Sequence, residues 1–166
     1  MKKSPLPLFI LLAFAACSGG GPAETARGVS LFSGLSVSGT DSNSPKWRLD
    51  TPAASMEDRE GRMIFSLPVM HFYADGRVSS IIKAQSGQFE LSKKSAVLSA
   101  NVSVDAKKEG MLLKTEKLYY SSEKGKIWTD EKVTLFRGKT VIKGKGFTAN
   151  PDLSEIEIEH QETKIK

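Results

Sequence analysis

The sequence predicts an all-β protein, and three observations support that prediction. Short segments alternate apolar and polar residues, as in Ile-Glu-Ile-Glu at 156–159, which is typical of strands with one buried face. Turn-forming residues recur roughly every ten residues between positions 60 and 151. Between residues 47 and 160 no convincing run of apolar residues has helical spacing. We therefore expect many short strands and no helix in the folded part.

The N-terminal residues 1–16 have the order of parts found in an export signal: two lysines, an apolar stretch and small residues. The stretch is shorter than the about 20 apolar residues that a spanning helix needs, so we expect it to be cleaved. Cys17, the only cysteine, follows two alanines as in the lipobox of bacterial lipoproteins, although Phe14 stands where leucine is usual. We expect a lipidated chain that begins at Cys17. Ordinary secretion with an unused thiol is the alternative.

Composition bounds what the mature protein can be. About 150 residues remain after cleavage, which is enough for one domain with a single core, and no internal disulfide is possible. The net charge of +5 falls to about +3 without the signal, and the charges alternate in sign, so a nucleic-acid partner is not indicated. Residues 17–44 are rich in small residues and are predicted to be a tether, with a possible first strand at 29–37. The folded domain is expected at 45–166.

The strand pattern repeats with a period of about 30 residues. Ile-Ile-Lys-Ala at 81–84 returns 31 positions later as Leu-Leu-Lys-Thr and 29 positions further on as Val-Ile-Lys-Gly. A valine follows nineteen positions after Asp50, after Lys83 and after Lys114. Each unit is predicted to contain about four short strands. Such a period indicates stacked units that bury their open faces against one another.

These repeated segments resemble the LptC family of periplasmic lipopolysaccharide-export proteins. The similarity spans about residues 45–160 and is carried by the order of its pieces, such as Gly-Lys-Ile-Trp-Thr-Asp at 125–130 and Ile-Lys-Gly-Lys-Gly-Phe at 142–147. LptA and the N-terminal domain of LptD share the repeat, but a tethered domain of about four units favours LptC. Typical members keep a transmembrane helix, and Ser18 replaces the aspartate that retains enterobacterial lipoproteins at the inner membrane. We expect an anchored periplasmic domain, at the inner membrane rather than the outer.

The resemblance implies a twisted, open β-jellyroll of two antiparallel sheets with an apolar groove for lipid A acyl chains. It also implies three partners: lipopolysaccharide or a similar glycolipid, an inner-membrane ABC transporter of the LptB/F/G type, and an LptA-like bridge protein. A lipid-binding lipoprotein chaperone, an LptA-like bridge component and a structural envelope lipoprotein remain alternatives. The groove candidates, which could equally fill a closed core, are Phe89, Leu98, Val102, Val104, Leu113, Leu118, Tyr120, Ile127, Val133, Leu135, Ile142, Phe147 and Ile156.

The C-terminal strands are predicted to offer a free edge to the LptA-like partner. Residues 155–159 alternate cleanly, and the polar tail from Gln161 is not expected to cover them. An edge that is merely solvated and protected by its glutamates is the alternative. The candidates for the docking edge are Phe147, Thr148, Ala149, Ile156, Glu157 and Ile158.

No pattern in the chain supports catalysis, a cofactor or a metal ion. His71 and His160 lie far apart in the sequence without cysteine partners, and no nucleophile elbow is present. Gly144 and Gly146 precede no helix, so they indicate a bulge or a tight strand crossing rather than a phosphate loop. The sequence therefore predicts a carrier rather than an enzyme.

Overall fold

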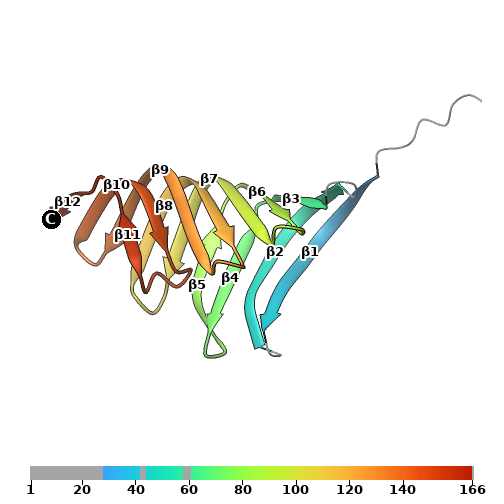
Figure 1. Cartoon of the computed structure of the whole chain (residues 1–166), viewed down its shortest axis with the longest axis horizontal. Coiled ribbons are helices and arrows are strands. Elements are labelled where there is room, and N and C mark those ends of the chain that lie inside the picture. The colour runs from blue at the N-terminus through green and yellow to red at the C-terminus, as the bar shows by residue number, and fades with distance from the viewer. Residues whose placement is uncertain (1–27, 42–43, 58–60, 166) are drawn as a thin grey trace, which may run out of the picture.

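The computed structural model describes residues 28–41, 44–57 and 61–165. All the regular secondary structure in these ranges is β-strand (Figure 1). The predicted all-β class is confirmed, and the pairings between strands are antiparallel. No helix among these residues is long and apolar enough to cross a membrane. The strands are β1 (Val29–Asp41), β2 (Ser44–Glu57), β3 (Arg62–Ser66), β4 (Val69–Ala74), β5 (Arg77–Lys83), β6 (Ser86–Glu90), β7 (Ser95–Ala106), β8 (Met111–Ser121), β9 (Lys126–Arg137), β10 (Thr140–Ala149), β11 (Ile156–Ile158) and β12 (Glu162–Ile165).

The long strands bend near their middles and pass from one layer to another. Residues 47–50 of β2 pair with β4, whereas residues 53–57 pair with β3. β7 behaves in the same way, because residues 103–106 pair with β5 and residues 95–99 pair with β6. We call the layer with β4, β5 and β12 the first layer, and the layer with β3, β6 and β11 the second. The result is the predicted jellyroll, in which one continuous antiparallel sheet folds into two layers.

The corners between the layers are built from special backbone positions and buried hydroxyls. Ala100 and Asn101 have φ values of 64° and 52°, and the register of β7 on β8 shifts beside them. Buried Thr51 donates its hydroxyl to the carbonyls of Ala53 and Ser66, at 2.8 and 2.6 Å. These bonds satisfy carbonyls where the sheet ladder turns, which is why a polar side chain is tolerated there.

The repeat predicted from the sequence is the unit of the fold. In each unit the chain runs along the first layer, turns a corner, forms a hairpin in the second layer and returns to the first layer. The hairpin pairs are β2–β3, β6–β7, β8–β9 and β10–β11. The recurring Lys-containing segments end the outgoing strands, and the valines begin the returning ones.

Gly146 forms the bulge that was predicted around the two glycines of β10. Its φ is +82°, and the register of β10 on β9 shifts between Lys145 and Phe147. A Cβ atom on Gly146 would lie 2.8 Å from a carboxylate oxygen of Glu159. The glycine is needed both for its left-handed backbone and for the close approach of the chain that follows β11.

The tether predicted over residues 17–44 is too long at its C-terminal end. β1 occupies Val29–Asp41 and pairs with β2 from Val29 opposite Glu57 to Asp41 opposite Ser44, so the folded part begins before residue 45. The possible strand at 29–37 is therefore present and extends further. Leu35 and Val37 pack against the core, while Ser36 and Ser38 point away from it, so serine-rich composition here conceals an alternating strand.

The polar tail covers a different edge from the one offered by residues 155–159. β12 pairs with residues 140–143 of β10 in the first layer, and among the described strands it does not pair with β11, which the tail leaves uncovered as expected. Backbone pairing needs no apolar side chains, which is why a polar tail can form this strand.

Candidate functional site

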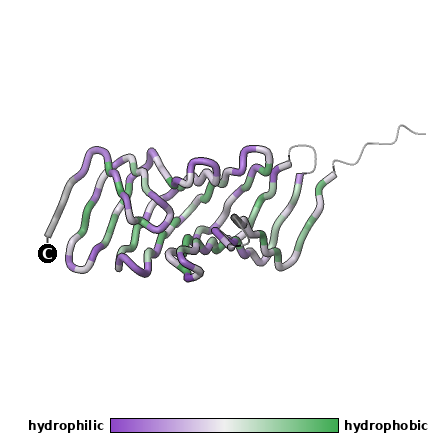
Figure 2. The backbone as a smooth tube through the Cα atoms, turned by 60° about the horizontal axis from the view of Figure 1, so that its bottom comes forward, coloured by the Kyte–Doolittle hydropathy of each residue, from purple (hydrophilic) through white to green (hydrophobic). Residues whose placement is uncertain are grey.

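The apolar residues predicted for the groove all lie between the two layers. Eleven of them are buried, at 8% exposure or less, and Ile142 and Ile156 are partly buried against the same cluster. Along the strands the buried positions alternate with exposed ones, and the hydrophilic residues gather at the turns (Figure 2). The structure thus brings the whole predicted set together in one continuous interior, where these side chains pack on one another.

Aromatic rings join the two layers in the N-terminal half of this interior. Phe72 in the first layer meets Tyr120 in the second, with ring centroids 5.0 Å apart in an edge-to-face arrangement. Trp47 packs against Phe89 at 5.6 Å and Tyr120 at 6.4 Å. Such pairs hold the sheets together beyond the burial of their area, by about 1 kcal/mol each.

The interior carries no charge among the described residues. The buried polar side chains are hydroxyls: Thr51, Ser79, Ser80, Thr115, Ser121 and Thr129. Burial raises the pKa of Tyr120, and a hydrogen bond with Ser122 only partly opposes that rise, so the phenol is neutral at physiological pH. Nor do the described residues include a group of three or more side chains that could hold a metal ion. Such an interior can bury hydrocarbon.

Two cavities open from the interior on the side opposite the corners. The mouth cleft, of about 480 Å³, lies between the ends of both layers and has an aromatic floor of Trp47, Phe72 and Tyr120. The C-terminal cavity, of about 300 Å³, is lined by Leu135, Ile142, Leu153, Ile156 and Ile158 together with Glu109 and Arg137. Both cavities combine apolar walls with a polar rim, which suits an amphiphile.

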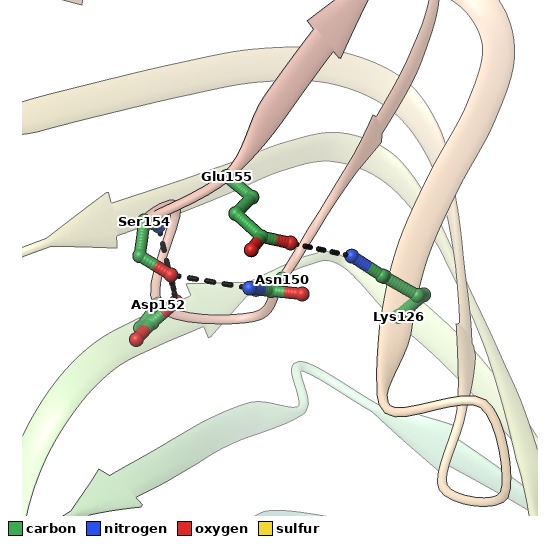
Figure 3. A network of polar contacts seen from close by, with 5 residues as sticks. All are labelled: Lys126, Asn150, Asp152, Ser154 and Glu155. Atoms are coloured by element: carbon green, nitrogen blue, oxygen red, sulfur yellow. Dashed lines mark hydrogen bonds and ion pairs between the residues drawn. The ribbon is translucent and has the colours of Figure 1, made fainter.

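The connection between β10 and β11 separates the two cavities. Asn150, Pro151 and Asp152 line the mouth cleft, and Leu153 lines the C-terminal cavity. A polar network fixes this loop, in which Asp152 accepts from Ser154 at 2.7 Å and Glu155 pairs with Lys126 at 3.1 Å (Figure 3). The loop thus belongs to the site even though it contributes no strand.

Two ends of the jellyroll carry strand edges. At the N-terminal end β1 pairs with β2 on one side, and no described strand pairs with its other side. Leu31 on this strand is 81% exposed, and Val29 and Phe32 are also exposed. A long edge with exposed apolar side chains is a surface that readily accepts another strand.

At the C-terminal end of the second layer the edge is β11, so half of the candidates for the docking edge lie on a strand with a free side. Ile156, Glu157 and Ile158 pair with β10 on one side only among the described strands. Residues 147–149 pair with both β9 and β11, so Phe147, Thr148 and Ala149 do not form a free edge. The correction follows from the hairpin, because β11 folds back and occupies the side of β10 that the prediction left open.

The hydrogen bonds of β11 show which amides face outward. Glu155 accepts from the amide of Asn150, and the amide of Glu159 donates to Gly146, each at 3.1 Å. Since antiparallel bonding alternates along a strand, the amides of Ile156 and Ile158 point away from β10. Their side chains turn inward, where both pack against the core.

Sequence reasoning missed the loop and the interior residues that β2, β4 and β5 contribute. Leu49, Met70, Phe72 and Ile82 are as buried as the predicted residues. The repeat could have found Leu49 and Ile82, because they precede Asp50 and Lys83 as Leu113 precedes Lys114. Leu153 is 1% exposed but lies in a sequence typical of turns, so no pattern indicates its burial.

Comparison with known proteins identifies the family. A family model described as "Lipopolysaccharide-assembly, LptC-related" matches residues 32–164. The chain belongs to the LptC-related family. This membership assigns it to lipopolysaccharide transport among the periplasmic proteins of the cell envelope. The match begins within β1, in agreement with the place of that strand in the fold.

Solved structures include chains that are similar in fold. An example is LptH from Pseudomonas aeruginosa, described as the LptA-homologous periplasmic component of the lipopolysaccharide transport device. The two chains share 9% sequence identity with a TM-score of 0.55, over 72% of this chain and 94% of that one. The comparison with curated proteins gives no match. The likeness therefore concerns the LptA-like jellyroll, which supports the architecture derived from the strand pairings.

Proposed function

We propose that this protein is a membrane-anchored component of lipopolysaccharide transport that passes lipid A acyl chains through its interior. It receives the glycolipid from an inner-membrane ABC transporter of the LptB/F/G type and gives it to an LptA-like bridge protein. The observation that carries the proposal is the continuous, uncharged interior that runs between two ends with free strand edges. Burial of each CH₂ group is favourable by about 0.8 kcal/mol, so such an interior holds acyl chains without directed chemistry.

The test is a photocrosslinking experiment in cells. A photoreactive residue at Ile142, which lines the C-terminal cavity, should capture a glycolipid, as should one at Leu118 or Val133. Glu157 is the matched control, because it is exposed on β11 between two inward-facing isoleucines. Equal yields at Ile142 and Glu157 would mean that the label reports surface contact, and the transport proposal would fail.

The anchor is a second part of the proposal, and it concerns residues that lie outside the described ranges. Cys17 is the proposed site of lipidation after cleavage of the signal over residues 1–16. Cys17→Ser should release the domain from membranes, measured by fractionation in high salt, because a lipid chain supplies most of the membrane affinity. A Cys17→Ser protein that is cleaved at the same bond and stays with the membrane would contradict lipidation.

The donor and the receiver are tested by purification from detergent-solubilised membranes. Recovery of an ATP-driven transporter and an LptA-like protein distinguishes this function from that of a free lipid chaperone. A chain that carries glycolipid but recovers neither partner would favour the chaperone.

A further inference from the structure

The loop from Asn150 to Glu155 reaches across the open side of the jellyroll. It connects β10 and β11 in the second layer, yet it contacts β5 in the first layer. Fully buried Ser80 donates its hydroxyl to the carbonyl of Pro151 at 2.5 Å, between residues 71 positions apart. In Figure 3 the loop passes in front of strands from the first half of the chain, in agreement with this contact. The loop is thus a strap that joins the two layers where they would otherwise part.

Leu153 is the residue of the strap that inserts its side chain into the interior. Its side chain is 1% exposed and belongs to the hydrophobic core. It forms a wall of the C-terminal cavity, and the preceding residues 150–152 form a wall of the mouth cleft. Between the two cavities the buried side chains form one hydrophobic cluster, to which Leu153 belongs. An acyl chain that moves along it from the mouth cleft to the C-terminal end therefore meets Leu153.

The polar contacts between the strap and the neighbouring strands include the hydrogen bond to β5 and an ion pair at the surface between Glu155 and Lys126 of β9. Leu153 itself has a φ of 58°, a left-handed backbone that a leucine rarely adopts. Burial of the side chain must therefore offset backbone strain. A hydrocarbon chain that takes the place of Leu153 replaces that burial while the strain is released.

We propose that the β10–β11 loop is a gate that closes the acyl-chain path when the interior is empty. This inference rests on the proposed function, because the cargo is taken to be a glycolipid acyl chain. In the closed state Leu153 fills the passage between the two cavities. In the open state Leu153 leaves the interior and the hydrogen bond between Ser80 and Pro151 is broken. The acyl chain of the cargo then moves toward β11. The gate keeps apolar surface covered between successive cargo molecules.

Rates of entry and release test the gate directly. The probe is 11-(dansylamino)undecanoic acid, followed by stopped-flow fluorescence with the full chain carrying Cys17→Ser. Ser80→Ala removes one buried hydrogen bond of the closed state, which is expected to raise the open population of the empty protein, and with it the entry rate, by about fivefold, while release from the open, loaded state stays unchanged. Lys126→Gln lies outside the interior and should raise the entry rate by less. Because neither change enlarges the passage, faster entry with unchanged release indicates gating, whereas no change in entry would contradict the gate.

Leucine variants distinguish removal of the blocking side chain from a general loosening of the fold. Leu153→Ala should raise the entry rate more than Ser80→Ala does, because it removes the side chain that blocks the path. Leu67→Ala is the matched control, since Leu67 also has a left-handed φ of 50° but is 56% exposed. It should leave the rates unchanged.

A reversible lock completes the experiment. Lys126→Cys with Glu155→Cys, joined by a reducible bismaleimide linker in the Cys17→Ser chain, should slow probe entry at least tenfold, and reduction should restore it. If the probe enters the locked and the reduced protein at the same rate, the gate is wrong although the interior still binds. If neither the probe nor a photocrosslinked glycolipid enters the unlocked protein, the proposed function fails instead.

Discussion

The two ends of the jellyroll differ in length, continuity and charge. The N-terminal edge is one strand, β1, which keeps its pairing with β2 from Val29 to Asp41 and exposes Leu31. The C-terminal edge is divided between β11 with three residues and β12 with four, which lie on different layers. Glu157 and Glu159 stand exposed on or beside β11. The same repeat thus ends in two unlike surfaces.

This difference indicates two kinds of contact. A long apolar edge can add a strand over many hydrogen bonds and bury side chains, which favours a stable partner. A short edge with acidic neighbours offers few hydrogen bonds and resists indiscriminate pairing, which favours a partner that binds and leaves. We infer that a carrier would bind a fixed donor through the long edge on β1 and a transient receiver through the short edge on β11.

The largest expected effect is loss of receiver binding when the C-terminal edge loses an outward amide. Ile158→Pro removes an N–H that faces away from β10 and leaves the acceptor of an added strand unpaired. Affinity for an isolated LptA-like partner should fall by about tenfold to hundredfold, because an unpaired group costs about 1–3 kcal/mol. The measurement is a titration by isothermal calorimetry, with circular dichroism to check the fold.

Ile158→Val is the control for side-chain packing at the same position, and it should leave binding nearly unchanged. A folded Ile158→Pro protein with normal affinity would exclude β11 as the docking edge. The N-terminal edge on β1 would then become the candidate for the receiver.

The second prediction compares the glycines at the two ends. Gly34 in β1 and Gly146 in β10 both have left-handed φ values, +67° and +82°. A Cβ on Gly34 meets nothing within 4 Å, whereas one on Gly146 meets the side chain of Glu159 at 2.8 to 3.1 Å. Gly34→Ala should therefore cost about 1 kcal/mol from the backbone alone, and Gly146→Ala about 2–3 kcal/mol. Urea denaturation measures both, and equal losses would mean that the crowding by Glu159 is relieved by movement of its side chain.

The sequence predicted the fold better than it predicted the edges, for a physical reason. Alternation and the spacing from Lys83 to Val102 depend on the chain itself, so they predicted strands and a repeating unit that the structure contains. Which side of β10 stays free depends on where later residues fold back, which no local pattern records. The burial of Leu153 is of the same kind, since it results from contact with β5 across the open side.

The third prediction tests whether self-association of the protein occurs through the apolar edge on β1. Leu31→Lys places a charge on an exposed position of β1, and charged side chains on an edge oppose strand addition. Self-association of the purified chain at high concentration should weaken by about tenfold, equivalent to about 1.4 kcal/mol. Sedimentation velocity over a concentration series measures it. Leu91→Lys, at a 45% exposed site that does not lie in an edge strand, is the control and should change little. If both variants weaken association equally, net charge rather than the edge is responsible.

The smallest effect concerns the polar contacts that hold each end to the body. Burial alone would raise the pKa of Asp50, but hydrogen bonds from Arg48 and from Ser36 on β1 outweigh it, so the pKa lies below its ordinary value of 3.8. The unfolded chain therefore binds more protons in acid, and the contribution of Asp50 is complete above its unfolded pKa and lost as the pH falls through the folded one. Asp50→Asn should lower the free energy of unfolding by about 0.5–1 kcal/mol at neutral pH and by nothing measurable at about pH 2.

At the other end, Glu155 pairs with Lys126 with 74% of its side chain exposed, so Glu155→Gln should change stability by less than about 0.5 kcal/mol at either pH. Urea titrations of the two variants at both pH values decide the comparison, and a larger loss for Glu155→Gln would show that the strap, not β1, is the more firmly held by charge.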